Sequence, residues 1–369
     1  MWEDNEREDS PEELFQDALI GHEWVAGLLQ SSIDTHKMSH AYVFSGPNGI
    51  GKSFLAHHFV MALSCLNPPP KVEGQLGFRF CGECRACRMI RDDKYPDVSV
   101  ISLEWQARME SGTGSTSANA NLKIDTIRSM QHEVSRAPIE APWRVFIVED
   151  AATMQVAAAN AFLKTLEEPP ARAIIILISD SDRALLPTIV SRCQVFELRS
   201  VPTETIEKAL EARGADEPTA RKLAALAVGR PGYALRAFFD KTHQDVDDRD
   251  EAVQEMEALL KADQAGRLAF SEELNSRWSA QGERRASVVT MLNLWLGWWR
   301  DLLLVYNGQG RYATNQDKLD TLQAQADRLH LGQIKEMLQW LTRAQSELDS
   351  NVSPRLALGD LFVNHLPRL

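Results

Sequence analysis

The sequence predicts an α/β domain built on a parallel β-sheet with a phosphate-binding loop and a cysteine-rich insertion, followed by two helical domains. Three observations predict this class. Residues 46–53 form a glycine-rich loop between an apolar strand and a helical segment. Strand-like and helical segments alternate up to about residue 200. Beyond Val201-Pro202 the strand patterns stop and helical patterns take over.

Length and composition support a multidomain protein without a membrane span. A chain of 369 residues, at roughly one domain per 100 to 200 residues, predicts about three domains. The longest apolar run, Leu292–Val305, contains Arg300 and Asp301 and falls short of the ~20 apolar residues that cross a bilayer. Residues 1–13 are acidic and lack the apolar core of a secretory signal, so we expect a mobile acidic tail on a cytoplasmic protein.

The net charge of -12 argues against binding nucleic acid by bulk electrostatics, because phosphate contacts need clustered Lys and Arg. Any contact with DNA must be local or shared with partners.

Strand and helix patterns alternate through residues 14–200. Strands are expected at Ala41–Ser45, Asp97–Leu103, Arg144–Val148, Ala173–Ser179 and Gln194–Leu198. Helices are expected at Leu14–Gln30, from Lys52 onward, at Thr126–Ser135 and at Ala157–Leu166. The continuously apolar run Ala173–Ser179 is typical of a central parallel strand that is covered on both faces. Small and polar residues at Met109–Asn121 predict a flexible loop.

The remainder of the chain predicts helices alone. A small helical domain is expected at residues 201–245, and a polar, acidic stretch at 241–251 separates it from a helical bundle at 252–369. The segment Leu292–Leu304 is too apolar for an isolated helix. Either a core within this chain or packing against other subunits explains it.

The glycine-rich loop matches G-x-x-x-x-G-K-[ST] in full. Its residues are Gly46, Pro47, Asn48, Gly49, Ile50, Gly51, Lys52 and Ser53. Glycines let the backbone curl so that its N–H groups point inward, Lys52 reaches the outer phosphates, and Ser53 can bind Mg²⁺. The expected ligand is a nucleoside triphosphate or its product, ATP or ADP with Mg²⁺.

Two acids, Glu149 and Asp150, follow the predicted strand Arg144–Val148. Hydrolysis of a nucleotide needs one acid near the metal and one that orients water. The order Glu then Asp gives the water-orienting position the shorter side chain. We therefore expect nucleotide binding with weak or absent turnover. The alternative is that both acids merely end a surface strand.

Three cysteines, Cys81, Cys84 and Cys87, recur at three-residue spacing, and Cys65 is the natural fourth ligand. Four thiolates with no open position predict a structural zinc site. The spacing also permits an iron–sulfur cluster, although zinc is favoured. The fifth cysteine, Cys193, stands apart and is expected to be a core thiol.

Longer strings of residues carry a family resemblance over about residues 14–240. They are Ile20-Gly21-His22, His40-Ala41-Tyr42-Val43-Phe44, the four cysteines, the run Asn160–Pro170, Leu185-Leu186-Pro187-Thr188-Ile189 and Ser191-Arg192-Cys193. With these strings the sequence resembles the delta-prime subunits of bacterial DNA polymerase III clamp loaders, which are AAA+ proteins.

The resemblance implies roles for individual residues. Arg192 corresponds to an arginine finger that projects towards ATP bound by a neighbouring subunit. Ser179 matches a polar sensor position near the γ-phosphate. Without the resemblance, Arg192 would be interpreted as a solvated charge or a member of a surface ion pair, and Ser179 equally well as a helix cap.

The resemblance also implies an assembly. Residues 201–245 correspond to the family's lid domain and residues 252–369 to a collar that packs five subunits in a ring. The implied partners are the gamma/tau and delta subunits and the sliding clamp, with primed DNA contacted through the assembled complex.

The lid of motor subunits carries an arginine in a Gly-Ser-x-Arg-x-Ala-Leu pattern, and this sequence has Gly232 at that position. Together with the order of Glu149 and Asp150, this indicates a stator that keeps a phosphate loop without a complete motor site. Two rival functions are an ATP-hydrolysing motor subunit of the gamma/tau type and a zinc-dependent DNA-binding module.

Overall fold

A computed structural model describes residues 19–72, 74, 76–112, 121–239, 244–281, 284–349 and 352–367. The predicted acidic tail, residues 1–13, lies outside this part. The described residues divide into two compact units. The first contains those before Glu207 together with Gly229–Leu235, and the second contains Glu207–Val228 and those from Arg236 on.

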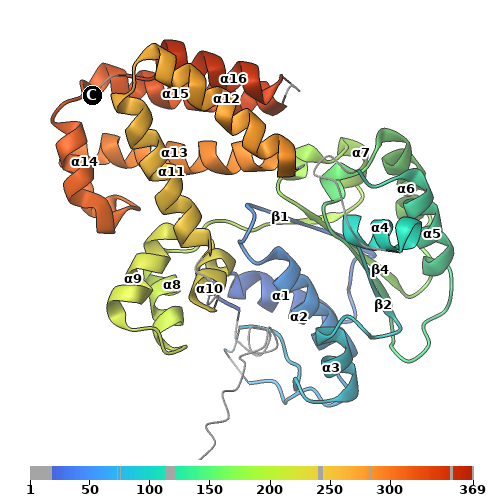
Figure 1. The fold of residues 1–369 in the computed structure, drawn as a ribbon. Coiled ribbons are helices and arrows are strands. Elements are labelled where there is room, and N and C mark those ends of the chain that lie inside the picture. The colour runs from blue at the N-terminus through green and yellow to red at the C-terminus, as the bar shows by residue number, and fades with distance from the viewer. Residues whose placement is uncertain are drawn as a thin grey trace, which may run out of the picture. The chain divides into compact units, whose positions relative to one another are not determined.

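The first unit is built on a five-stranded parallel sheet with the strand order β2-β3-β4-β1-β5 (Figure 1). The strands are β1 (Ala41–Ser45), β2 (Val98–Ile101), β3 (Arg144–Val148), β4 (Ala173–Ser179) and β5 (Gln194–Glu197). The parallel sheet confirms the predicted α/β class. Ser45 at the end of β1 pairs with Ser179 at the end of β4, so the loop after β1 begins beside the carboxyl end of β4.

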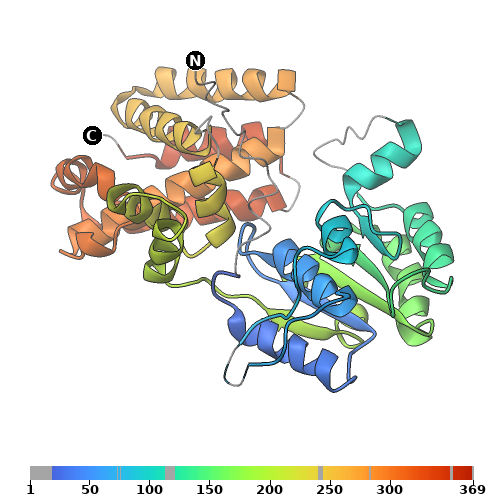
Figure 2. The ribbon, with the colours of Figure 1, turned by 90° about the horizontal axis from the view of Figure 1, so that it is seen from below.

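Two apolar layers sandwich the sheet because successive side chains of a strand point to opposite faces. Tyr42 and Phe44 of β1 belong to the layer covered by α1 (Glu23–Asp34), α2 (Lys52–Ser64) and α3 (Arg85–Arg91). Val43 between them belongs to the layer covered by α5 (Ile124–Val134) and α6 (Val156–Glu167). Figure 2 shows from below that helices lie on both faces of the sheet. Every residue of β1, β3 and β4 is buried, as their apolar runs predict.

Helix α4 (Leu103–Ser111) is the main departure in this unit from the sequence-based expectation. It occupies the start of the predicted loop at Met109–Asn121, of which residues 113–120 lie outside the described residues. Ser102 begins the helix as its N-cap, because its hydroxyl accepts the Trp105 N–H at 3.1 Å. One short turn, α7 (Pro187–Val190), and two 3₁₀ turns, Ala151–Thr153 and Asp182–Ala184, complete the connections.

The described chain after β5 forms helices and no strand. They are α8 (Thr203–Glu211), α9 (Glu217–Leu226), α10 (Pro231–Phe239), α11 (Gln244–Lys261), α12 (Gln264–Gln281), α13 (Arg284–Tyr306), α14 (Leu319–Ala326), α15 (Leu331–Asp349) and α16 (Pro354–Asp360). Short turns Gly310–Tyr312 and Gln316–Lys318 and a π-helical turn Leu361–His365 lie among them. The stretch at 241–251, expected to separate two domains, is part of helix α11 from Gln244 onward.

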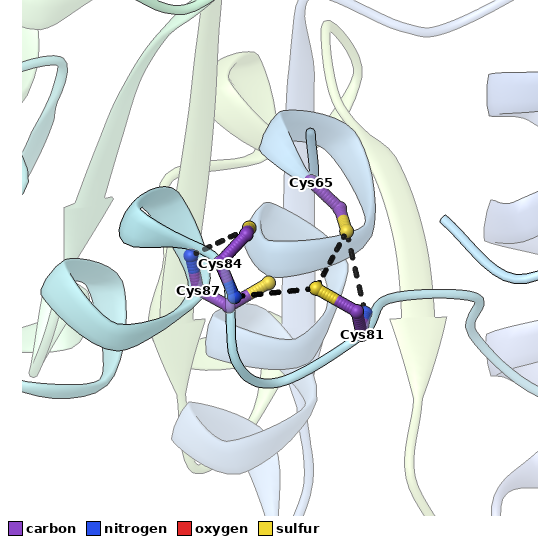
Figure 3. A group of neighbouring side chains, drawn as sticks. All are labelled: Cys65, Cys81, Cys84 and Cys87. Atoms are coloured by element: carbon purple, nitrogen blue, oxygen red, sulfur yellow. Dashed lines mark hydrogen bonds between the residues drawn. The ribbon is translucent and has the colours of Figure 1, made fainter. Parts of the chain in front are cut away.

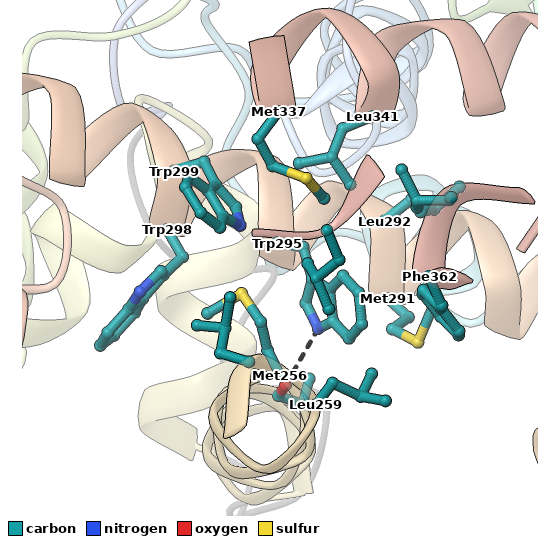
Figure 4. Packing of buried hydrophobic residues seen from close by; sticks show 14 of the residues in the cluster. Met256, Leu259, Met291, Leu292, Trp295, Trp298, Trp299, Met337, Leu341 and Phe362 are labelled. Atoms are coloured by element: carbon teal, nitrogen blue, oxygen red, sulfur yellow. Dashed lines mark hydrogen bonds between the residues drawn. The ribbon is translucent and has the colours of Figure 1, made fainter. Parts of the chain in front are cut away.

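Three tryptophans of α13 explain the apolar run at 292–304. Trp295, Trp298 and Trp299 are fully buried in a core made by helices of the same unit (Figure 4). Trp295 Nε1 donates to the carbonyl of Ala252 at 2.9 Å, and Trp298 Nε1 donates to Gln325 Oε1 at 2.9 Å. A core within this chain therefore covers these residues. Within the described residues, no helix is both long enough and apolar enough to cross a membrane.

A buried polar cluster connects helices of the second unit. The Arg249 guanidinium donates to Asn315 Oδ1 and to both carboxylate oxygens of Asp317. Asp301 is fully buried and accepts the backbone and side-chain N–H groups of Asn315 at 2.7 Å. From α9, Lys222 lies 3.6 Å from the same Asp317. The cluster thus joins α9, α11 and α13, which are distant in sequence.

Candidate functional site

The glycine-rich loop joins β1 to α2 and requires its glycines. Gly46, Gly49 and Gly51 have φ angles of 147°, 78° and 107°, a region that other residues rarely adopt. A Cβ on Gly46 would also lie 2.4 Å from the carbonyl oxygen of Leu198. Strand, loop and helix therefore follow in the order that a phosphate-binding loop needs.

Lys52, the first residue of α2, is buried with its ammonium group inside the loop. Its Nζ donates to the carbonyls of Gly46 at 2.6 Å and Pro47 at 3.2 Å, and to Asp180 Oδ1 at 2.7 Å. Asp180 was not among the predicted site residues. Its position directly after Ser179, at the end of a central strand, is the signal that could have identified it.

Ser53 and Glu149 lie side by side in the structure. The Ser53 hydroxyl donates to Glu149 Oε1 at 3.1 Å. Burial raises the pKa of Glu149, and the Ser53 hydroxyl and the charge of His57 oppose that effect. Two neighbouring side-chain oxygens at the start of a phosphate-binding helix fit the hard, oxygen-preferring Mg²⁺.

Asp150, the second acid, has a left-handed backbone with φ of 50°. Burial raises its pKa, the charge of Asp180 adds to this, and Lys52 opposes it. The Asp150 carboxyl therefore lies within electrostatic reach of the Lys52–Asp180 pair.

Ser179 uses its hydroxyl locally. The buried Oγ donates to the Ser181 carbonyl at 2.7 Å, while the Ser179 carbonyl accepts the Gly46 N–H at 3.3 Å. The next turn, Asp182–Ala184, is capped by Ser181 and not by Ser179. Ser179 therefore contacts the loop through its backbone.

The four predicted zinc ligands converge (Figure 3). The Sγ atoms of Cys65, Cys81, Cys84 and Cys87 all lie within 4.8 Å of one another. Backbone N–H groups of Cys81, Cys84 and Cys87 donate to the sulfurs of the preceding cysteines at 3.3, 3.3 and 3.5 Å. Four gathered sulfurs with N–H donors fit a tetrahedral zinc thiolate site.

Individual thiols differ in their environments. Burial by itself would raise the pKa of Cys84, but N–H groups of Cys87 and Leu66 and the neighbouring thiols lower it to about 6. Cys193, outside the cluster, packs against the apolar layer of the first unit, and burial raises its pKa to about 12.

Arg192 follows α7 and keeps part of its side chain exposed. Its Nη1 donates to the Thr188 carbonyl at 3.0 Å and to Ser191 Oγ at 3.3 Å, and its Nη2 donates to Glu167 Oε1 at 2.8 Å. The Arg192 side chain is 37% exposed, so part of it is accessible to another molecule. Glu167 was quoted in the sequence only as part of a family string, and its contact with Arg192 was not expected.

Gly232 lies directly against the glycine-rich loop. Its N–H donates to the Gly49 carbonyl at 2.8 Å, and a Cβ at this position would lie 2.8 Å from the same oxygen. The glycine that replaces the lid arginine of motor subunits is thus demanded by close backbone packing.

Comparison with known proteins gives a consistent family. The family model described as DNA polymerase III, delta subunit, matches residues 21–202. The delta' subunit of Pseudomonas aeruginosa is 33% identical over 60% of this chain and 62% of the relative. The delta' subunit of Bacillus subtilis is 25% identical over 89% of this chain and 91% of the relative.

A match to the tau subunit of Bacillus subtilis covers less of the molecule. It is 33% identical over 52% of this chain, and the chain spans only 30% of that relative's length. Over residues 21–202 the chain is similar to the clamp-loader proteins of DNA polymerase III, and its delta' relatives make it a delta'-like protein.

Proposed function

We propose that this chain is the stator of a DNA polymerase III clamp loader, which supplies an arginine finger to ATP bound by a neighbouring subunit. The observation that carries the proposal is the partly exposed Arg192 side chain within Ser191-Arg192-Cys193. A cation at that place would neutralise charge that develops on the transferred phosphoryl group.

Its own loop serves as a nucleotide-binding element. Ser53 and Glu149 would hold Mg²⁺ with ATP or ADP, and Lys52 would contact the phosphates after leaving Asp180. Turnover is weak because Asp150 is a short acid at the water-orienting position and Gly232 offers no side chain to the phosphates. When bound, Mg²⁺ supplies charge neutralisation of the phosphates.

The cysteine cluster holds zinc as a structural ion, with Cys65, Cys81, Cys84 and Cys87 as ligands. No open coordination position remains for chemistry when four thiolates bind. Residues 201–245 act as a lid and 252–369 as a collar within a pentameric ring.

The partners are the gamma/tau and delta subunits and the sliding clamp, and primed DNA is contacted through the complex. The chain works in the cytoplasm. The gamma/tau and delta' names of the relatives support this assignment.

The test replaces Arg192 in the assembled complex. Arg192→Ala should abolish the share of ATP turnover that arises at the facing site, where an arginine finger is worth on the order of 10³-fold. The measurement is the ATPase rate of the reconstituted complex on primed DNA. Assembly, checked by gel filtration, should be unchanged because the side chain is partly exposed.

Arg199→Ala is the matched control. Arg199 lies seven residues after Arg192 in the sequence. Its side chain is exposed and pairs with Glu197 at 3.3 Å. This variant should retain the wild-type rate. An Arg192→Ala complex that assembles and hydrolyses ATP at the wild-type rate would overturn the proposal.

A further inference from the structure

A histidine one helical turn beyond Ser53 contacts both the loop and the cysteine insertion. His57 is buried, with Nδ1 2.8 Å from the Ser53 carbonyl oxygen and Nε2 3.0 Å from Asp93 Oδ1. A carbonyl oxygen and a carboxylate oxygen can only accept hydrogen bonds. Both ring nitrogens must therefore donate, which makes His57 an imidazolium cation.

The electrostatic surroundings of His57 agree with this charge. Burial lowers the pKa of His57, but hydrogen bonds to Asp93 and Ser53 and the charges of Asp93 and Glu149 raise it overall. The cation is thus held between an acid of the insertion and an acid at the end of β3.

Asp93 lies just past the helix that the cysteines begin. Cys84 is the N-cap of α3, and its sulfur accepts the Cys87 N–H at 3.5 Å. Seven residues of helix and the C-cap Asp92 follow. Asp93 comes after them with φ of 53°, and its N–H donates to the Ile90 carbonyl at 3.2 Å. A metal on the four sulfurs would fix one end of α3, and the Asp93 carboxylate extends from the other end.

On the loop side, His57 acts on both proposed magnesium ligands. Its ring is bonded to the backbone of Ser53, whose hydroxyl donates to Glu149. The position of the Glu149 carboxylate is therefore connected to His57 through Ser53. A residue at position 57 without the two ring nitrogens would lose this connection.

We infer that His57 and Asp93 form a link by which the zinc-bound insertion holds Ser53 and Glu149 in position to bind Mg²⁺ with nucleotide. Both are positioning residues and neither touches the nucleotide. The inference rests on the proposed nucleotide site, and it gives the cysteine insertion a role in that site.

The test compares nucleotide affinity with and without magnesium. His57→Gln, Asp93→Asn and the double variant are titrated with fluorescent ADP in Mg²⁺ or in EDTA, and the zinc content of each is measured. Each single variant should weaken the Mg²⁺-dependent affinity about three- to tenfold, and the double variant should lose no more, because the pair acts as one unit. Affinity in EDTA and zinc content should stay at wild-type values.

Asp92→Asn is the matched control, because Asp92 precedes Asp93 but lies 3.8 Å from Lys94 instead of facing His57. It should bind as wild type. Zinc-free wild-type protein should show the loss seen in the variants, and the zinc-free double variant should lose nothing further. Additive losses in the double variant, or equal losses in EDTA, would overturn the link.

Nitrogen NMR of His57 separates failure of the link from failure of the nucleotide site. The zinc-loaded wild type should show two protonated ring nitrogens, and Asp93→Asn or zinc removal should change those signals. If wild-type protein binds no nucleotide, the proposed nucleotide site fails while the link is still decided by this spectrum. A spectrum that neither change alters contradicts the link.

Discussion

The loop lysine is already neutralised by its own protein. All three N–H donors of the Lys52 ammonium have partners: the carbonyls of Gly46 and Pro47 and the carboxylate of Asp180. A nucleotide must displace at least part of this set before its phosphates can reach Nζ. The free energy needed to break these contacts reduces nucleotide affinity. It favours a site that binds nucleotide without repeated rounds of hydrolysis.

Removing the competing acid should therefore tighten binding. Asp180 is 76% exposed, so its pair with Lys52 contributes only about 0.2–1 kcal/mol. Asp180→Asn should improve the Kd for Mg²⁺·ADP by about two- to fivefold, and isothermal titration calorimetry measures it. Asp182→Asn, in the same segment, is the control and should leave the Kd unchanged. Weaker binding by Asp180→Asn would show that the acid supports the nucleotide instead of competing with it.

Site residues within one motif could be predicted, whereas their partners could not. The loop and the cysteine run have fixed spacings that follow from the chemistry of phosphate and thiolate binding, so Ser53 and Cys84 were expected where they lie. Asp180, Asp93 and Glu167 are acids outside these spacings, and of the three only Asp180 has a local signal, its place directly after the strand that ends at Ser179. They meet their partners across 128, 36 and 25 residues, respectively, and only the tertiary fold determines those meetings.

At the scale of elements, helix α10 and the glycine-rich loop touch backbone to backbone. The Gly232 N–H donates to the Gly49 carbonyl near the start of α10, where helix N–H groups lack partners within the helix. In a motor subunit an arginine at this place would reach the nucleotide. Here a direct contact with the loop replaces that connection.

Gly232→Ala should destabilise the sheet unit, because the new Cβ would meet a backbone oxygen that cannot move aside easily. Overpacking of this kind costs about 1–3 kcal/mol. Urea unfolding followed by fluorescence measures the change as a lower midpoint.

Gly297→Ala is the contrasting control within α13, where a Cβ would meet nothing within 4 Å. It should stabilise its own unit by about 0.5–1 kcal/mol, the usual gain of Ala over Gly in a helix. A Gly232→Ala protein as stable as wild type would contradict the close contact.

Elements with a strong apolar run were predictable, and short capped helices were not. Strands β1, β3 and β4 have the predicted bounds because burial on both faces imposes a continuous apolar sequence. Helices α3 and α4 have seven and nine residues, too few to show a clear helical period. The N-caps of these helices, Cys84 and Ser102, were the available signals. The metal-ligand pattern obscured the cap of α3, and the small polar residues of the predicted loop obscured helix α4.

At the scale of the whole molecule, the chain contains its own cores. The tryptophans of α13 are buried among helices of the same unit, and the sheet has an apolar layer on each face. A charge of -12 also favours solubility over association with DNA phosphates. ATP turnover can therefore be measured on the purified chain in the absence of any complex.

The central claim is that this chain contributes its arginine to a neighbour and does little hydrolysis of its own. ATP turnover by the purified chain tests it most directly, compared with Lys52→Ala and with a mixture that contains gamma/tau subunits. The account predicts that wild type alone is no faster than Lys52→Ala, and that turnover appears in the mixture and falls with Arg192→Ala. Rapid hydrolysis by the chain alone, abolished by Lys52→Ala, would contradict the account and identify a motor subunit.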